Sequence, residues 1–222
     1  MIEFPVNGGT AQGYLATPNG GSGPALIVLQ EYWGLVPHIE DVTERFAAEG
    51  FIALAPDLFH GDTAKSSDKA GHLLMGLDIP RAAREIGGAA DYVLAQTGVT
   101  TKKAAAVGFC MGGQLALLGA CEHPAKIGPT VNFYGVHPKV ELHPERLTSP
   151  VLAHFATRDD FVSKEVADAL VDRIAKAGKQ VIRYDYEADH AFFNDARPEV
   201  YDAECSQLAW ARTLKFLREH AA

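Results

Sequence analysis

The sequence predicts an α/β fold with a mostly parallel central sheet flanked by helices, and three observations support it. Short apolar runs alternate with longer segments of helical period, which is the pattern of a sheet covered by helices on both faces. Most of the short runs are apolar throughout, as strands buried on both faces should be. The alternation continues along the chain without an interdomain linker or an internal repeat. We therefore expect one domain over residues 1–222.

Strands are expected where apolar or β-branched runs are bounded by glycine, proline or polar residues. The run ALIVLQ at residues 25–30 and the run AAAVGF at residues 104–109 are clear examples. The predicted strands are residues 13–16, 25–30, 51–55, 104–109, 130–134, 151–156 and 181–186.

Helices are expected between these strands, and the last one has a single apolar stripe because its apolar residues recur every three or four positions. Ser163 is expected to cap one helix, and Pro198 to lie in the first turn of another. The polar stretch at residues 60–69 is predicted to be a surface loop, and residues 19–24 a turn. The predicted helices are residues 39–49, 80–96, 111–122, 164–177 and 198–219.

Composition and charge exclude several classes of protein. The 222 residues are 47% hydrophobic and 22% charged, which is typical of a globular protein. The 20 Lys and Arg against 28 Asp and Glu give a net charge of −8 without a basic cluster, so we expect no nucleic-acid partner. No run is apolar for the ~18 residues of a membrane span, so no membrane interaction is expected. The first residues do not resemble a signal peptide and three cysteines are too few for a disulfide framework, which predicts a cytoplasmic location.

The strongest local signal is AAAVGFCMGG at residues 104–113, where an apolar strand runs into G-x-C-x-G-G and then into a helical segment. This pattern is a nucleophile elbow with cysteine in the serine position. We expect Gly108 and Gly112 to leave room for the tight turn, which exposes the Cys110 sulfur at a helix N-terminus and favours a thiolate. The alternative role, a small buried hydrophobic residue, suits Cys121 and Cys205, because neither lies in such a turn.

A thiol nucleophile needs a base and an acid that orients it, and in this architecture their order along the chain is nucleophile, acid, histidine. Asp159 and Asp160 follow one predicted strand, and His190 follows the last one. Both groups therefore lie past the carboxyl ends of strands, the edge where open α/β sheets place their sites. Spacing leaves the choice between the two aspartates open.

The strand predicted at residues 25–30 runs directly into an acid, two aromatic residues and a glycine. An acyl-transfer site needs backbone N–H donors for the developing oxyanion, one after the nucleophile and one in the loop after this strand. Met111 and Tyr32 are the candidate donors. Glu31 either pairs with the thiol or the histidine at the mouth of the site, or is a solvated loop carboxylate; the sequence leaves both open.

Four motifs together resemble the dienelactone hydrolase family of α/β-hydrolases: QEYWG at residues 30–34, GFCMGG at 108–113, RDDFV at 158–162 and EADHAF at 187–192. The resemblance covers nearly the whole chain and implies an α/β-hydrolase fold. It also implies a triad of Cys110, His190 and Asp159, because the Phe-Val pair after the aspartates puts the first of them on the catalytic position. In the same scheme, Glu31 holds the resting thiol until substrate entry swings the sulfur toward the histidine.

The family's dienelactone substrate carries a carboxylate that two arginines bind in the best-known members, and this chain departs there. The loop before Asp78 has Lys65 and Lys69 instead of an arginine, and Asn194 stands four positions past the histidine. Lysine lacks the bidentate fork of arginine, so we expect a weaker or rearranged carboxylate clamp. The predicted substrate-binding residues are Trp33, Phe192, Asn194 and Arg197.

These observations predict hydrolysis of an ester or lactone, such as a dienelactone-like enol lactone, through an acyl-cysteine intermediate. One alternative is a general carboxylesterase or thioesterase for small neutral substrates, which fits the missing arginines. Another is a non-catalytic redox sensor in which Cys110 forms a sulfenate, although a sensor needs no triad. No cofactor or metal ion is expected, because the nucleotide-binding glycine motifs are absent and His137 and His143 lie in a loop without a third ligand nearby. The expected partner is a small-molecule ester or lactone, and the chain is expected to be a monomer or a simple homo-oligomer.

Overall fold

The computed structural model describes residues 1–221, and its centre is an eight-stranded sheet in the order β1-β2-β4-β3-β5-β6-β7-β8. β1 and β2 form an antiparallel hairpin at one edge, β2 pairs antiparallel with β4, and the remaining neighbours are parallel. The strands are β1 (Ile2–Val6), β2 (Gly9–Ala16), β3 (Ala25–Leu29), β4 (Ile52–Pro56), β5 (Ala104–Phe109), β6 (Ile127–Phe133), β7 (Val151–Arg158) and β8 (Val181–Asp189).

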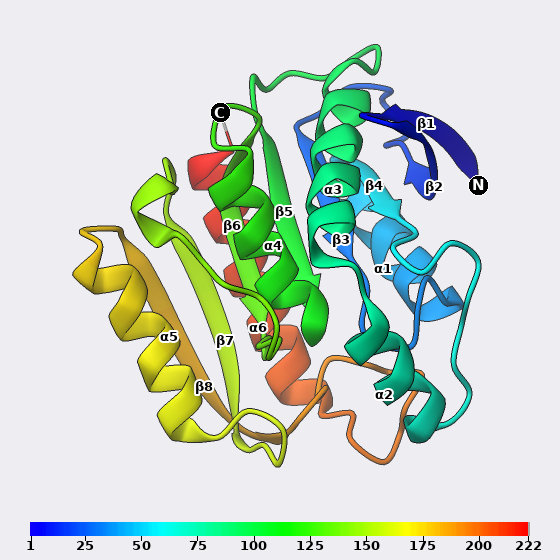
Figure 1. Ribbon diagram of the computed structural model, residues 1–222. Helices are drawn as coiled ribbons and strands as arrows, with labels where there is room; N and C mark the ends of the chain where they lie inside the picture. Colours follow the sequence, from blue (N-terminus) through cyan, green and yellow to red (C-terminus); the bar gives the residue numbers. More distant parts are fainter. Residues whose placement is uncertain (222) are drawn as a thin grey trace.

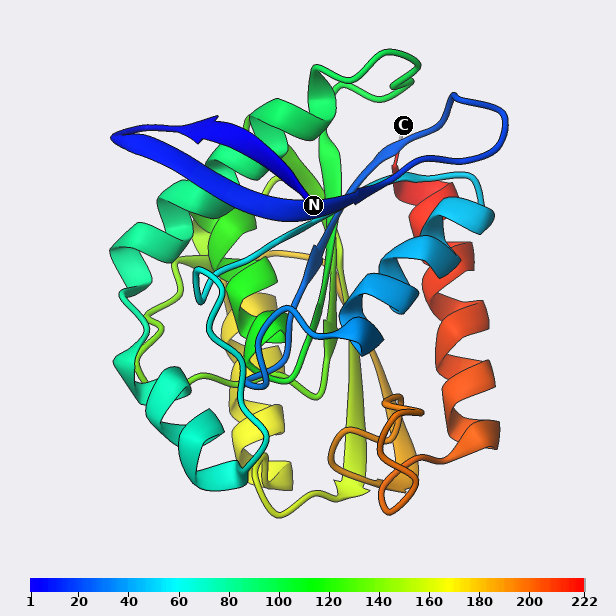
Figure 2. The same ribbon diagram turned by 90° about the vertical axis from the view of Figure 1, so that its right-hand side faces the viewer.

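Helices cover both faces of this sheet (Figure 1). The view along the sheet edge shows α3, α4 and α5 on one face and α1 and α6 on the other (Figure 2). The helices are α1 (Pro37–Ala48), α2 (Ser67–Gly76), α3 (Ile79–Leu94), α4 (Met111–Glu122), α5 (Lys164–Lys176) and α6 (Ala203–His220), with a short 3-10 helix at Pro144–Arg146.

The strands are apolar throughout because each central strand contributes to two separate cores. In β3, Leu26 and Val28 pack with residues of α1 and α6, whereas Ile27 and Leu29 pack with residues of α3 and α4. All four side chains are fully buried. Burial of each such side chain contributes about 1.5–3 kcal/mol, so the central strands are well anchored and their carboxyl ends are fixed positions for functional groups.

The chain adds β4 on one side of β3 and then crosses over to add β5 on the other side, so the order in which strands are added reverses between β3 and β5. At such a switch point, the loops after the two strands turn away from each other and leave a crevice at their carboxyl ends. Residues 30–34 follow β3 and Cys110 follows β5, so both predicted site segments lie at the carboxyl ends of these two neighbouring strands.

The predicted fold class is confirmed; the differences are one strand and one helix that were not predicted, and shifts at the ends of other elements. Strand β1 was not predicted, because Phe4 is its one buried residue and the exposed Glu3 and Pro5 interrupt the apolar signal. Helix α2 begins inside the predicted loop at residues 60–69, where Ser66 accepts the N–H of Lys69 as an N-cap. Helix α6 begins at Ala203 instead of Pro198, because the side chain of Asp202 caps it.

Other differences are shifts of a few residues, the largest being β2, which begins at Gly9, and β6, which begins at Ile127. Ser163 caps α5 as predicted, accepting the N–H of Val166. Within residues 1–221, none of the helices combines the length and apolarity that crossing a bilayer requires.

Candidate active site

Cys110 occupies a strained turn between β5 and α4. Its backbone has φ 53° and ψ −125°, a conformation that is costly for a residue with a side chain. A Cβ atom at Gly108 would lie 1.9 Å from the carbonyl oxygen of Gly112, and one at Gly112 would lie 2.4 Å from the carbonyl oxygen of Leu29. Both positions therefore require glycine, and the turn leaves the cysteine side chain partly exposed.

His190 and Asp159 meet beside this turn, on the loops after β8 and β7. His190 Nδ1 donates to Asp159 Oδ2 at 2.7 Å, and the other carboxylate oxygen accepts the backbone N–H groups of Phe161 and Val162 at 2.8 and 2.7 Å. The Asp159 side chain is 1% exposed, and three donors fix its orientation. The neighbouring Asp160 is exposed, so the structure separates the two aspartates that spacing left open.

Cys110 and Asp159 both influence the ionisation of the His190 imidazole. Burial lowers the pKa of His190, but hydrogen bonds with Asp159 and Cys110 and their charges raise it to about 10. The rings of Tyr134 and Phe161 flank the imidazole, with centroids 5.1 and 4.9 Å away. In space, His190 therefore lies between Asp159 and the turn that holds Cys110, which is the arrangement that an orienting acid, a base and a nucleophile require.

Glu31, two residues past the end of β3, is buried. Of the two roles that the sequence left open, it is therefore not a solvated loop carboxylate. Its Oε2 accepts a hydrogen bond from Asn194 Nδ2 at 2.6 Å. Its Oε1 has no hydrogen-bond partner among the described residues. Among the described residues, the hydrogen bond of Glu31 is with Asn194 and not with the Cys110 thiol, which differs from the resting pairing of glutamate with thiol that the family resemblance implies.

Tyr134, directly after β6, was not among the predicted site residues. It is fully buried with φ 43°, and burial, followed by the charges of Glu31 and Cys110, raises its pKa well above the ordinary value. The adjacent Gly135 packs so closely on the elbow that a Cβ there would lie 2.3 Å from the carbonyl oxygen of Cys110. The Tyr-Gly pair at a strand end was the available sequence signal, since it marks a close approach of two backbones.

The segment with the predicted oxyanion donor Tyr32 lies against the first turn of α4, which carries the other donor, Met111. A Cβ at Gly112 would lie 2.5 Å from the carbonyl oxygen of Gln30, so the end of the β3 segment and the start of α4 are in direct contact. Burial of the Tyr32 side chain raises its pKa. The Tyr32 and Trp33 rings contact each other edge-on, with centroids 4.6 Å apart.

The four predicted substrate-binding residues are placed differently from one another. The Arg197 guanidinium lies 5.1 Å from the ring centroid of Trp33 and pairs with Glu199 at 2.8 Å. Asn194 is buried and bonded to the Glu31 carboxylate. Phe192 is fully buried in the core. Across residues 1–221, no group of three or more His, Cys, Asp or Glu side chains is arranged to hold a metal ion.

The sheet order, the helices on both faces and the cysteine elbow place the chain among the α/β-hydrolases. It belongs to the dienelactone hydrolase family, whose model matches residues 11–221. The family and enzyme class expected from the sequence are thus confirmed, and the chain is a hydrolase that acts on esters or lactones.

Individual relatives match over nearly their full length. Protein usf of Aquifex pyrophilus is 34% identical, with 99% of this chain and 98% of that protein covered. A carboxymethylenebutenolidase of Pseudomonas sp. strain P51 is 31% identical, with 95% and 91% covered. A solved structure described as a dienelactone hydrolase-like promiscuous phosphotriesterase from metagenomic libraries superimposes with a TM-score of 0.85 at 26% identity, with 98% and 96% covered.

Proposed function

We propose that this chain hydrolyses its ester or lactone substrate through an acyl-cysteine intermediate, with Cys110 as nucleophile, His190 as base and acid, and Asp159 as the group that orients the imidazole. The observation that supports this most directly is the 2.7 Å bond between Asp159 and His190, together with the strained turn that holds the partly exposed Cys110. The carboxylate fixes Nδ1 as the protonated donor atom, which leaves Nε2 for the thiol and the substrate.

In the first half of the reaction, the Cys110 thiol gives its proton to His190 Nε2, and the sulfur attacks the carbonyl carbon so that a C–S bond forms. Backbone N–H groups of Met111 and Tyr32 stabilise the oxyanion. The tetrahedral species then collapses, the bond to the leaving oxygen breaks, and this oxygen takes a proton from His190 Nε2. An enol lactone suits this step because its enolate is a good leaving group.

In the second half, a water molecule attacks the thioester carbonyl carbon and gives a proton to His190. Collapse of this second tetrahedral species breaks the C–S bond, releases the carboxylic acid and regenerates the sulfur nucleophile. No electron transfer is involved.

The charge distribution at the mouth of the site favours a small neutral ester as a second candidate substrate class. Arg197 is paired with Glu199, and Asn194 is a neutral amide already bonded to Glu31. Neither residue offers an unpaired cation to a substrate carboxylate. A panel of short p-nitrophenyl esters, acyl thioesters and carboxylated enol lactones therefore decides between the two classes: faster turnover of the neutral compounds supports a carboxylesterase or thioesterase.

The experiment that tests the mechanism is replacement of the nucleophile. Cys110→Ala is expected to abolish p-nitrophenyl ester and enol-lactone hydrolysis, whereas Cys205→Ala, which removes a partly exposed thiol on α6, is expected to retain it. Mass spectrometry of wild-type protein quenched during turnover should find the acyl group on the peptide containing Cys110. Unchanged rates in Cys110→Ala contradict the proposal, and a sulfenate without any acyl adduct supports the redox-sensor alternative instead.

We further propose a cytoplasmic, cofactor-free enzyme whose partner is the small-molecule substrate, as a monomer or simple homo-oligomer. The support is the sequence: an acidic net charge of −8, three cysteines and no nucleotide-binding glycine motif. Fractionation of the native cell and sedimentation of the purified protein test these points.

A further inference from the structure

Strained backbone in this protein is concentrated at the active site, with one exception. Among the described residues other than glycine, positive φ angles occur at His60, Cys110, Tyr134 and Ala191. The last three belong to the site or directly follow His190. His60 has φ 55° and lies on the loop between β4 and α2. Such a conformation costs of order 1–3 kcal/mol and persists only where surrounding contacts hold it.

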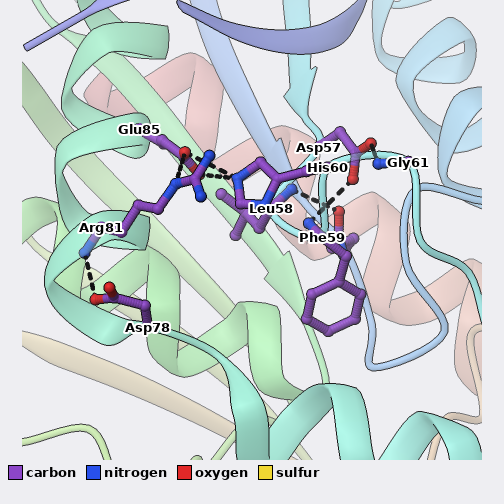
Figure 3. A network of polar contacts seen from close by, with 9 residues as sticks. Asp57, Leu58, Phe59, His60, Gly61, Asp78, Arg81 and Glu85 are labelled. Atoms are coloured by element: carbon purple, nitrogen blue, oxygen red, sulfur yellow. Dashed lines mark hydrogen bonds and ion pairs between the residues drawn. The ribbon is translucent and has the colours of Figure 1, made fainter. Parts of the chain in front are cut away.

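The contact that holds His60 is a buried carboxylate on α3. Glu85 has a side chain that is 3% exposed, and His60 Nε2 lies 2.9 and 3.1 Å from its two oxygens. Arg81 Nε donates to Glu85 Oε1 at 2.8 Å from one turn earlier on the same helix. Figure 3 shows the imidazole reaching the carboxylate from the loop and the guanidinium reaching it from the same helix, α3. They line a cleft of about 260 Å³ between the loop and the helices α2 and α3.

The loop at residues 57–64 is itself rigid around His60. Asp57 Oδ1 accepts the N–H of Phe59 at 3.1 Å, and Oδ2 accepts the N–H of Gly61 at 2.5 Å. Asp62 N donates to the carbonyl oxygen of Phe59. These bonds tie together the residues on both sides of His60, so we expect a change at His60 to affect the whole loop.

This loop touches the segment at residues 30–34 at three points. Leu58 N donates to the side-chain oxygen of Gln30 at 3.2 Å, and Ala64 N donates to the carbonyl oxygen of Trp33 at 3.0 Å. At the third point, the backbone of Asp62 and that of Gly34 are so close that a Cβ at the glycine would lie 2.6 Å from the Asp62 oxygen. Two of the three contacts are at Trp33 and Gly34, the two residues that directly follow Tyr32.

We propose that His60 is a positioning residue for the oxyanion donor of this enzyme: its bond to Glu85 fixes the loop at residues 57–64, and the loop fixes the backbone N–H of Tyr32. The inference rests on the proposed acyl-cysteine mechanism, which gives that N–H its role. The donor must point at the place where charge develops in the transition state, and a misplacement of about 1 Å can reduce the rate roughly 100-fold. His60 does not touch the substrate in this scheme.

Three variants separate positioning from simple stabilisation. His60→Ala removes the contact between loop and helix and is expected to lower kcat roughly 10-fold with KM changed less than about 2-fold, because the donor acts in the transition state. His60→Gln keeps an N–H donor that reaches Glu85 and should recover most of the lost kcat. Arg81→Ala is the matched control, since it removes the other partner of the same carboxylate from α3 without touching the loop. It should lower the melting temperature but leave kcat unchanged.

The measurements are kcat and KM for a p-nitrophenyl ester at a temperature well below the melting point of every variant. Wild-type kcat in His60→Ala, or an equal loss of kcat in Arg81→Ala, overturns the positioning role. Cys110→Ala is measured in the same series. If it retains full activity, the proposed mechanism fails; if it is inactive while His60→Ala matches wild type, only the positioning inference fails.

Discussion

Asn194 donates its side-chain amide to the buried carboxylate of Glu31 across 2.6 Å, joining the loop after β8 to the end of the β3 segment. The two residues are 163 positions apart in the chain, and both are almost fully buried. A buried carboxylate is stable only when it is hydrogen-bonded or paired, so this amide is a structural requirement as well as a neighbour of the nucleophile.

Asn194→Leu, which keeps the side-chain volume but removes the donor, is expected to lower the free energy of unfolding by about 2 kcal/mol. Urea denaturation measures the change. In a double-mutant cycle, Glu31→Gln should reduce the penalty of Asn194→Leu, because a neutral amide tolerates the lost donor better than a carboxylate. If Asn194→Leu lowers the free energy of unfolding equally with Glu31 and with Gln at that position, the hydrogen bond between the amide and the carboxylate contributes nothing specific.

Asp159→Asn should reduce kcat for ester hydrolysis by at least roughly 100-fold, because the amide can no longer fix the tautomer and orientation of His190. The pKa of His190, about 10 in the intact site, should fall at the same time, since a hydrogen bond to a carboxylate is lost. NMR titration of the imidazole checks this directly. Asp160→Asn changes an exposed neighbour and serves as the control with near-wild-type values.

Acid should destabilise the fold through His154, which is fully buried between Tyr186 and Thr213 at 2.8 and 3.0 Å. Burial, followed by the charge of Arg212, lowers its pKa from 6.5 to about 3. Between these two values the unfolded chain binds a proton at this ring and the folded chain does not, so stability falls as the pH falls, by up to roughly 1.4 kcal/mol per unit.

Urea denaturation at about pH 7 and about pH 4.5 tests this, because the window between the two pKa values covers that change. His154→Gln should lose less stability over this range than the wild type. Identical pH dependence in the two proteins would assign the acid sensitivity to other groups.

Gly108→Ala should destabilise the protein by about 3 kcal/mol or more, or prevent folding, because its Cβ would overlap the Gly112 carbonyl oxygen at 1.9 Å. Gly71→Ala on α2 is the matched control. Its Cβ meets nothing within 4 Å, and alanine should stabilise the helix by about 0.5–1 kcal/mol. Thermal unfolding of the two variants should therefore shift in opposite directions.

The features that sequence predicted well are those with a strong local pattern. Cys110 was singled out because its strand, its glycines and its helix are contiguous, and His190 because it alone of the nine histidines lies between the last predicted strand and the final helix. The choice of Asp159 over Asp160 depends on which carboxylate turns toward the imidazole, and the geometry of two separate loops decides that. Helix α2 was not predicted because its apolar stripe is weak. Among the described residues of this helix, Ala70 is the one that is buried.

Tyr134 and His60 were missed for a different physical reason. Both residues have a positive φ angle, and apart from the glycine after Tyr134 the sequence gives no sign of a left-handed backbone at a tyrosine or a histidine. Their importance depends on partners far away in the chain, such as Glu85 for His60. Long-range contacts of single polar residues leave no periodic signal.

The crowding around the elbow sets where this enzyme can acquire new substrates. There is no room for a side chain at Gly108, Gly112 or Gly135, so these positions around the nucleophile accept only glycine. Helix α2, which is largely solvent-exposed and borders an open cleft, accepts many sequences at little cost. Diversification of specificity, whether by natural drift or by directed evolution, should therefore accumulate in α2 and the loop before it while the reactive centre stays invariant.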